Sequence, residues 1–157
     1  MESTGQWGTV DLYIGLGSNL GDRKRNLEEA LGRLDLAMGR HYDAVSDFIG
    51  TEPWGFESRE KFLNAVVRYV LDVPRGTDFN DLAHNILTQC KSIERAMGRT
   101  GEPEFDGAGN RIYRSRVIDL DILLLGDVRI DDEDLKIPHP LMQERDFVMT
   151  PLQQILR

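Results

Sequence analysis

The sequence predicts an α+β fold of the ferredoxin-like class: a single-domain βαββαβ sandwich with an extra short strand and short helices. Two observations predict it. Four short, mostly apolar runs end at turn residues, as strands do, and two longer segments repeat apolar residues at helical spacing. The chain has 157 residues, 40% of them hydrophobic, which is enough for one buried core. Residues 1–9 precede the first strand, and we expect them to form a flexible extension to a domain over residues 10–157.

The first strand is expected over residues 10–16, where a mostly apolar run meets a glycine-rich turn. Asp22 can cap the helix that follows, and Gly39 lies near the end of that helix. The buried face of the helix is predicted by four apolar residues at i, i+3, i+4 and i+7, namely Leu27, Ala30, Leu31 and Leu34.

Two strand-like runs come next, over residues 45–51 and 62–71. The turn-rich segment Glu52-Pro53-Trp54-Gly55 joins them, and Pro74 and Gly76 close the second run. Together with the first strand they supply three of the four strands that the fold requires.

The second helix has the clearest amphipathic pattern in the chain. It opens at Thr77, and Gly98 is placed to end it. Residues 100–112 follow without any apolar period, and a loop of this length is more often functional or mobile than idle. The apolar stripe of the helix consists of Phe79, Leu82, Ala83, Ile86, Leu87, Cys90, Ile93 and Met97.

The fourth strand is expected over residues 117–125. Gly126 and Asp127 then begin a turn into the short run Val128-Arg129-Ile130. Short helical pieces are expected over residues 139–144 and 151–156.

Composition excludes several classes of partner and compartment. The formal net charge is −8, whereas a general nucleic-acid or anionic-membrane binder needs a basic face. No apolar run approaches the ~20 residues of a membrane span, and the first residues show no secretory signal. Cys90 is the only cysteine, which excludes an intrachain disulfide and a cysteine-based zinc site. We therefore expect a cytoplasmic protein.

The glycine-rich turn Gly15-Leu16-Gly17-Ser18-Asn19-Leu20-Gly21 is not a dinucleotide fingerprint. Leu20 occupies the position of the third glycine, and no Walker A lysine follows. Two interpretations stay open for this turn. It is either a tight connection from a strand to a helix or a segment whose backbone lines a small-molecule pocket.

Asp119 and Asp121 are the most informative pair. Positions two apart on a strand share a face, which sets these carboxylates roughly 7 Å apart. Magnesium typically takes one or two carboxylates plus substrate phosphates, so the pair is a candidate magnesium site. The alternative is pairing with arginines or exposure at a strand end. The opposite face of the strand is expected to carry Ile118, Leu120, Ile122 and Leu124.

Arginines gather just before this carboxylate pair. Arg111, Arg114 and Arg116 precede it closely, and Arg99 flanks the long loop on its other side. Guanidinium groups suit bidentate phosphate recognition, although any single one of them could form a simple salt bridge. Together with the carboxylates, they favour a metal–polyphosphate site.

Four further residues are candidates for ligand contacts. His139 is bracketed by prolines, and the alternative is that it is a surface histidine without a functional role. A strand asparagine such as Asn64 needs hydrogen-bond partners if buried, and a flat heterocycle could supply them. Phe62 and Phe147 could stack on such a ring or could simply belong to the core.

In this order, the motifs resemble the 6-hydroxymethyl-7,8-dihydropterin pyrophosphokinase family of the folate pathway, over roughly residues 10–153. The most specific motif is Arg-x-x-Asp-Leu-Asp, which begins at Arg116 and lies between Gly-Ser-Asn-Leu and Pro-His. The resemblance rests on residues 14–22, 51–55, 62–66, 93–95, 98–99, 116–123, 138–140 and 145–148.

The resemblance implies transfer of the β,γ-diphosphate of ATP to the hydroxymethyl oxygen of the pterin, with release of AMP. It implies two Mg²⁺ ions held by Asp119 and Asp121, and catalytic roles for these carboxylates with Arg99 and Arg116. Tyr113 stands where the family often has tryptophan. The ATP-binding residues that the resemblance implies are Glu94, Arg99, Tyr113, Arg116, Ile122, His139 and Arg145.

The resemblance also implies a pterin site in which Phe62 and Phe147 sandwich the ring. The partners are then the two small substrates, and we expect a monomer. Two other hypotheses compete: a ferredoxin-like module that binds a small molecule without chemistry, and a metal phosphohydrolase in which water is the acceptor. The implied pterin-binding residues are Thr51, Pro53, Trp54, Phe62, Asn64 and Phe147.

Overall fold

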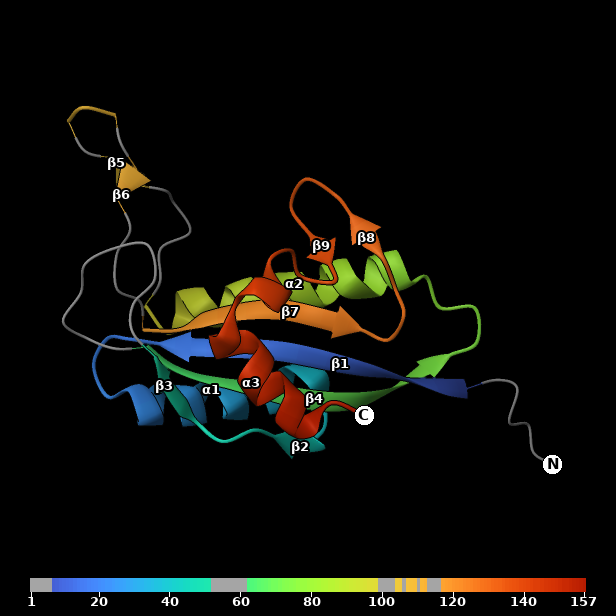
Figure 1. Ribbon diagram of the computed structural model, residues 1–157. Coiled ribbons are helices and arrows are strands. Elements are labelled where there is room, and N and C mark those ends of the chain that lie inside the picture. The colour runs from blue at the N-terminus through green and yellow to red at the C-terminus, as the bar shows by residue number, and fades with distance from the viewer. Residues whose placement is uncertain (1–6, 52–61, 99–103, 106, 110, 113–116) are drawn as a thin grey trace.

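A computed structural model describes residues 7–51, 62–98, 104–105, 107–109, 111–112 and 117–157 (Figure 1). It confirms an α+β fold with the predicted order of the main elements. In chain order, these are β1 (Trp7–Ser18), α1 (Arg23–Met38), β2 (Ala44–Val45), β3 (Ile49–Thr51), β4 (Phe62–Pro74), α2 (Phe79–Ala96), β5 (Glu104–Phe105), β6 (Arg111–Ile112), β7 (Asp119–Leu125), β8 (Ile130–Asp131), β9 (Lys136–Ile137), η1 (Met142–Glu144) and α3 (Asp146–Ile155).

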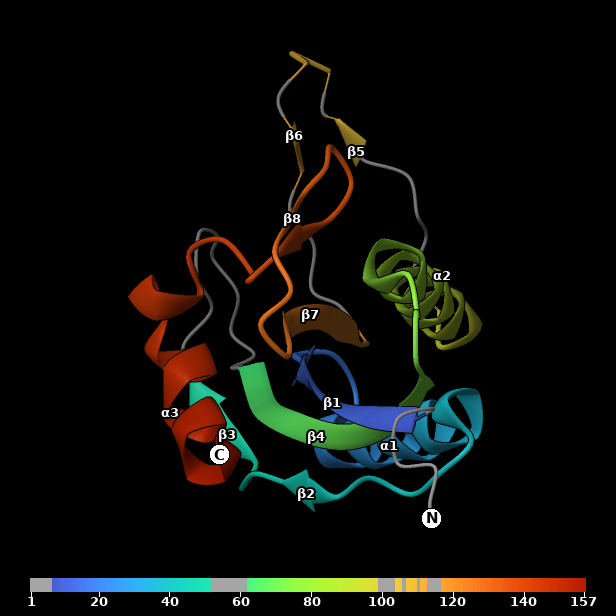
Figure 2. The ribbon, with the colours of Figure 1, turned by 90° about the vertical axis from the view of Figure 1, so that its right-hand side faces the viewer.

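The main sheet is antiparallel throughout and has the order β2-β4-β1-β7, with β3 also paired to β4. This is the strand order of two split βαβ units, because β1 lies between the two strands that α2 connects. Helices α1 and α2 lie on one side of the sheet and α3 on the other (Figure 2). No helix in the described residues is long and apolar enough to cross a membrane.

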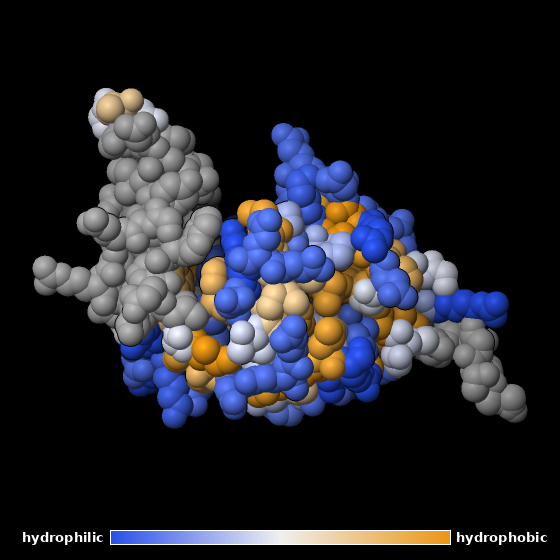
Figure 3. Space-filling model, in the orientation of Figure 1, coloured by the Kyte–Doolittle hydropathy of each residue, from blue (hydrophilic) through white to orange (hydrophobic). Residues whose placement is uncertain are grey.

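Strand alternation divides the apolar side chains between two clusters. On β1, Leu12 and Ile14 face α1 and α2 within the larger cluster. Tyr13 points the other way and packs with Leu152 of α3 in the smaller cluster. Hydrophobic and hydrophilic residues are interspersed over the face in Figure 3. The four predicted core residues of α1 are all buried: Leu27, Ala30, Leu31 and Leu34.

Helix ends follow capping chemistry. Asp22 caps α1 as predicted, since its side chain accepts a hydrogen bond from the Arg25 amide at 3.2 Å, and Gly39 ends that helix in the left-handed conformation. For α2, the N-terminal cap was predicted one residue too early, at Thr77. The cap is Asp78, whose carboxylate accepts from the Asn80 amide at 2.9 Å, whereas the Thr77 hydroxyl turns back to the Pro74 carbonyl.

The strands differ from their predicted bounds in two ways. β1 begins at Trp7, so residues 7–9, which we assigned to a flexible extension, belong to the sheet. The single run expected over residues 45–51 is broken into β2 and β3 at Ser46. There the Ser46 amide still donates to the Val66 carbonyl at 2.9 Å, but the Val66 amide donates to the Ser46 hydroxyl at 2.9 Å. A side chain thus replaces one main-chain acceptor of the ladder.

The face assignment of Leu124 was wrong. The register of β1 and β7 shifts between Tyr13 and Ile14, which inserts one extra residue into β7. As a result, Leu123 and Leu124 both pack with the α3-side cluster, and Leu125 takes the core position that we expected for Leu124.

The second half contains more regular structure than the sequence indicated. The described parts of the 100–112 loop include a short hairpin, β5 with β6. A second hairpin, β8 with β9, covers part of the predicted run over residues 128–130. Helix α3 starts at Asp146, earlier than the predicted 151–156 piece, and it includes Pro151. Burial of Pro151 and Leu152 offsets the one backbone hydrogen bond that the proline cannot donate.

The Tyr69 hydroxyl donates a 2.6 Å hydrogen bond to Asp35, which joins β4 to α1. Because Tyr69 is fully buried, we expect Tyr69→Phe to lower the free energy of unfolding by about 1–3 kcal/mol, measured by urea denaturation. Tyr42→Phe is the matched control, since Tyr42 contacts Asp35 through its main-chain amide. An equal loss in both variants would contradict the assignment.

Candidate active site

Asp119 and Asp121 lie on the face of β7 that is turned away from α1 and α2. Their neighbours Ile118, Leu120 and Ile122 are buried in the cluster against those helices, so alternation places both carboxylates on the α3 side. The Asp121 side chain is 45% exposed. The predicted side-by-side arrangement is therefore present, at an accessible position.

The central strand offers no side chains beside this pair. Gly17 pairs with Asp119 on one side and with Asn64 on the other, and Gly15 pairs with Asp121. The line from Asn64 across Gly17 to Asp119 therefore spans three strands, or about 10 Å between its outer Cα atoms.

The turn that follows Gly17 is held by a residue that sequence reasoning missed. Asn26 of α1 donates to the Ser18 hydroxyl at 3.1 Å and to the Leu20 carbonyl at 2.8 Å. Ser18 and Asn19 are both fully buried. The residues after Gly17 therefore form a tight connection from β1 to α1, which was the first of the two interpretations. Gly15 and Gly17 lie beside the carboxylates, and the second interpretation, a pocket lined by this backbone, stays a prediction.

Phe62 and Asn64 lie on the same face of β4, since they alternate with the core residues Ala65 and Val67. Asn64 is 7% exposed and Phe62 is partly exposed. The main chain of Thr51 pairs with that of Phe62, which brings the end of β3 to this position. Asn64 is thus a buried polar group beside an aromatic ring, two strands from the carboxylates.

His139 approaches the carboxylates from the segment that follows β9. Its amide donates to the Leu123 carbonyl at 3.0 Å, and its Nε2 lies 3.9 Å from an Asp121 oxygen. The peptide bond before Pro138 is cis. Burial lowers the pKa of His139 most and the Arg145 charge lowers it further, whereas the Pro140 main chain and the Asp119 charge oppose the shift. His139 is therefore predominantly neutral at pH 7, and its buried Nδ1 has no hydrogen-bond partner among the described residues.

Arg145 and Phe147 stand at the start of α3. The Arg145 guanidinium carbon lies 5.7 Å from the centroid of the Phe147 ring, in the range of a cation–π contact. Both side chains are partly exposed. The pair thus joins a cation and a ring at the edge of the α3 face.

Glu94 has a supporting position beneath the carboxylates. It is 4% exposed on α2, and its carboxylate accepts a 2.8 Å hydrogen bond from the amide of Leu120, the residue between Asp119 and Asp121. Burial, with the nearby charges of Glu94 and Asp121, raises the pKa of Cys90 to about 12, which keeps this thiol protonated.

The other predicted site residues fall into two groups. Ile122 is 5% exposed in the core against α1 and α2, so its side chain faces away from the Asp121 carboxylate. The remaining predicted residues lie outside the part of the chain that the structure describes: Pro53, Trp54, Arg99, Tyr113 and Arg116.

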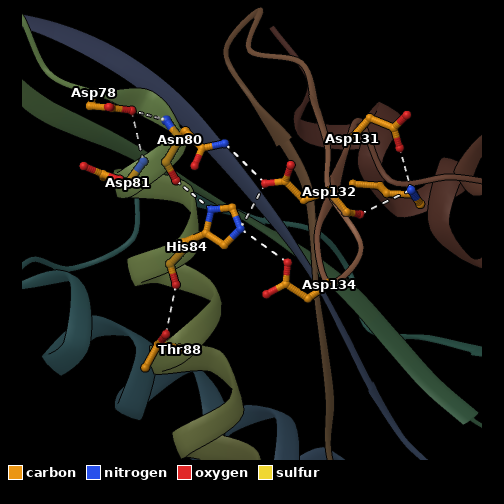
Figure 4. Close-up of polar contacts among 9 residues, drawn as sticks. Asp78, Asn80, Asp81, His84, Thr88, Asp131, Asp132 and Asp134 are labelled. Atoms are coloured by element: carbon orange, nitrogen blue, oxygen red, sulfur yellow. Dashed lines mark hydrogen bonds and ion pairs between the residues drawn. The ribbon is translucent and has the colours of Figure 1, made fainter.

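A second cluster, which the sequence did not suggest, joins α2 to the β8–β9 hairpin (Figure 4). His84 Nε2 lies 3.2 Å from Asp132 and 3.4 Å from Asp134, while Nδ1 is 2.9 Å from the Asn80 carbonyl. These contacts raise the pKa of His84, the hydrogen bond to Asn80 most. A protonated imidazole can donate to all of these oxygens, so a proton satisfies the cluster and we assign no metal to it. It lies about 15 Å along α2 from Glu94.

Comparison with known proteins matches residues 13–157 to the family described as 7,8-dihydro-6-hydroxymethylpterin-pyrophosphokinase. A 2-amino-4-hydroxy-6-hydroxymethyldihydropteridine pyrophosphokinase of Porphyromonas gingivalis is 41% identical, over 92% of this chain and 89% of the relative. The protein of the same name from Bacillus subtilis is 38% identical, over 91% and 76%. The mitochondrial folate synthesis bifunctional protein of Pisum sativum is 38% identical, over 93% of this chain and 25% of the relative.

The contact between Glu94 and the Leu120 amide predicts a difference between two substitutions. Glu94→Ala leaves a buried N–H unpaired and should lower the free energy of unfolding by about 1–3 kcal/mol. Glu94→Gln keeps an acceptor and should retain most of that stability. Hydrogen exchange at the Leu120 amide should accelerate in the alanine variant only. Equal acceleration in both variants would show that the charge, rather than the acceptor, matters.

The His84 cluster predicts a pH dependence of stability. The folded state raises the pKa of His84, so its contribution is fully present below the unfolded pKa and is lost as pH rises through the folded pKa. The stability difference between the wild type and His84→Gln should therefore shrink as pH rises from about 5.5 to about 8.5. Urea denaturation across this range measures the difference, and a constant one would contradict the assignment.

Proposed function

The chain belongs to the 7,8-dihydro-6-hydroxymethylpterin-pyrophosphokinase family, and on this basis we propose the reaction that it catalyses and the residues that carry it. It transfers the β,γ-diphosphate of ATP to the hydroxymethyl oxygen of 6-hydroxymethyl-7,8-dihydropterin, a step of folate biosynthesis. The observation that carries the assignment of residues is the line Asn64–Gly17–Asp119. Along it, a polar position suited to a heterocycle adjoins a carboxylate pair with only a glycine between them.

We propose that the activity requires two Mg²⁺ ions, with Asp119 and Asp121 as protein ligands. The donor set supports this, because both are hard oxygen ligands on one face and the Asp121 side chain is accessible to solvent. Burial lowers the pKa of His139, which favours the neutral form of this imidazole beside the pair. When bound, Mg²⁺ would neutralise phosphate charge and align the attacking and leaving oxygens.

In the proposed reaction, the pterin hydroxyl oxygen forms a bond to the β-phosphorus of ATP. The bond from that phosphorus to the oxygen bridging the α- and β-phosphates breaks, AMP leaves with this oxygen, and the hydroxyl proton passes to solvent. Arg145 and His139, together with Arg99 and Arg116, are proposed to hold the phosphates, because guanidinium and imidazole N–H groups donate to phosphate oxygens. Electrostatic stabilisation of this kind is the main protein contribution to phosphoryl transfer.

The pterin is proposed to lie between Phe62 and Phe147, with its polar edge toward Asn64. Thr51, Pro53 and Trp54 would complete this edge from the segment after β3. Support comes from the burial of Asn64, since a buried carboxamide binds a ligand that matches its donor and acceptor and rejects one that does not. The proposal separates a pterin half of the site on β4 from a phosphate half on β7.

We further propose that a single chain works in the cytoplasm. The one cysteine, Cys90, is a buried free thiol, which suits a reducing compartment that also supplies ATP.

Incubation with ATP, Mg²⁺ and 6-hydroxymethyl-7,8-dihydropterin tests the function directly. We expect AMP and pterin diphosphate in equal amounts. AMP without the pterin would identify a hydrolase, and tight binding without any product would identify a binding module.

The carboxylate pair gives the sharper prediction. Asp119→Asn and Asp121→Asn each keep the side-chain shape but remove an anionic ligand, so kcat should fall by roughly 100-fold or more while the fold is retained. AMP release at limiting and saturating Mg²⁺ measures the effect, with circular dichroism as the control for folding. Full activity of either variant at limiting Mg²⁺ would refute the metal assignment.

A further inference from the structure

β1 contains three glycines, and two of them, Gly15 and Gly17, lie beside the carboxylate pair although the strand conformation does not require them. A glycine inside a strand is less favourable than alanine by roughly 0.5–1 kcal/mol. Neither Gly15 nor Gly17 is among the residues of positive φ, so backbone conformation does not explain them. Another physical reason for a glycine in a strand is the close approach of a neighbouring group, which a side chain would block.

The space above Gly17 is occupied by predicted ligand-binding residues. A Cβ atom added at Gly17 would lie 3.0 Å from Asn64 Oδ1 and 3.6 Å from Phe62 Cδ1. The first distance is shorter than ordinary van der Waals contact, so the carboxamide would have to move by a few tenths of an ångström. At Gly15 the nearest atoms would be those of Leu123 at 3.5 Å, an ordinary contact.

Asn64 is a buried residue whose main chain is paired on both sides. Asn64 is 7% exposed in the interior of the sheet, and its main chain pairs with Gly17 and with Ile49 on either side. A buried carboxamide discriminates between ligands by the positions of its oxygen, which accepts a hydrogen bond, and of its NH₂ group, which donates one. A small displacement of the carboxamide would weaken the hydrogen bonds that these two groups make to a ligand. The atom that a Cβ at Gly17 would approach most closely is Asn64 Oδ1, the hydrogen-bond acceptor of the carboxamide.

We propose that Gly17 is a specificity-determining residue of the pterin site. Its missing side chain lets the Asn64 oxygen lie over β1 and leaves the path from Asn64 to Asp119 open. Gly17 contributes no functional group of its own and acts by positioning Asn64. This inference rests on the proposed function, because it assigns the pterin to the Asn64 side of the site.

The test compares Gly17→Ala with Gly8→Ala. Gly8 is also on β1, and a Cβ atom there would meet nothing within 4 Å, so Gly8→Ala controls for the change of a strand glycine to alanine. Fluorescence titration with 6-hydroxymethyl-7,8-dihydropterin should give a Kd raised at least about tenfold in Gly17→Ala only, the loss of roughly one hydrogen bond. The Kd for ATP should change by less than about twofold in both variants. Thermal unfolding should show that both variants are folded.

A double-mutant cycle isolates the mechanism. In the Asn64→Ala background the oxygen is gone, so adding Gly17→Ala should raise the pterin Kd by less than about twofold. If Gly17→Ala raises the pterin Kd by the same factor with and without the Asn64 side chain, Gly17 does not act by positioning Asn64. A Kd for Gly17→Ala equal to that of the wild type would overturn the proposal.

One measurement does not depend on the pterin. In the ¹⁵N-labelled protein without substrates, Gly17→Ala should shift the side-chain amide signals of Asn64, which Asn64→Ala identifies, whereas Gly8→Ala should leave them in place. Unshifted signals would overturn the positioning of Asn64 by Gly17. If Gly17→Ala shifts these signals but the wild type does not bind the pterin, only the proposed function is refuted.

Discussion

The pairing of β1 with β4 on one edge and with β7 on the other is the constraint on which the site depends. Three strands in a fixed antiparallel register bring Asn64, Gly17 and Asp119 onto one line, although these residues are far apart in the sequence. A slip of one residue would turn each side chain to the opposite face, and would place Asp119 and Asp121 against α1 and α2. The apolar cluster between the sheet and helices α1 and α2 fixes this register. It therefore also fixes the arrangement of the polar residues on the opposite face, which α3 covers.

The two faces of β7 are connected through one amide. Leu120 buries its side chain in the core, while its N–H donates to Glu94 of α2. This bond matters because β7 pairs with β1 on only one edge within the main sheet, which leaves outward N–H groups that need partners. A carboxylate from the helix layer serves as the partner at the residue between the two proposed metal ligands. The position of the carboxylate pair is thus set from both edges of the strand.

Two groups of carboxylates in this protein show how context separates structural from functional acids. Asp132 and Asp134 face the imidazole of His84, whose pKa is raised. The protonated imidazole can therefore donate to the two carboxylates and link them. Asp119 and Asp121 instead adjoin His139, whose pKa is lowered by burial and by Arg145. The lowered pKa of His139 favours its neutral form, which adds no positive charge beside this second pair. The same residue types therefore lead to a structural link in one place and a proposed ligand site in the other.

The sequence by itself determined the element order, the core face of α1 and the shared face of Asp119 and Asp121, because these depend on helical and strand periodicity within short segments. The motifs also sufficed to indicate the family. Only the tertiary structure decided the register, the break at Ser46, the extra residue near Leu123 and the contact of Glu94 with Leu120. Each of these is a pairing between segments distant in the sequence, and no local pattern specifies which atoms meet. For the same reason, the glycine at position 17 has a physical explanation only once Asn64 is seen to lie beside it.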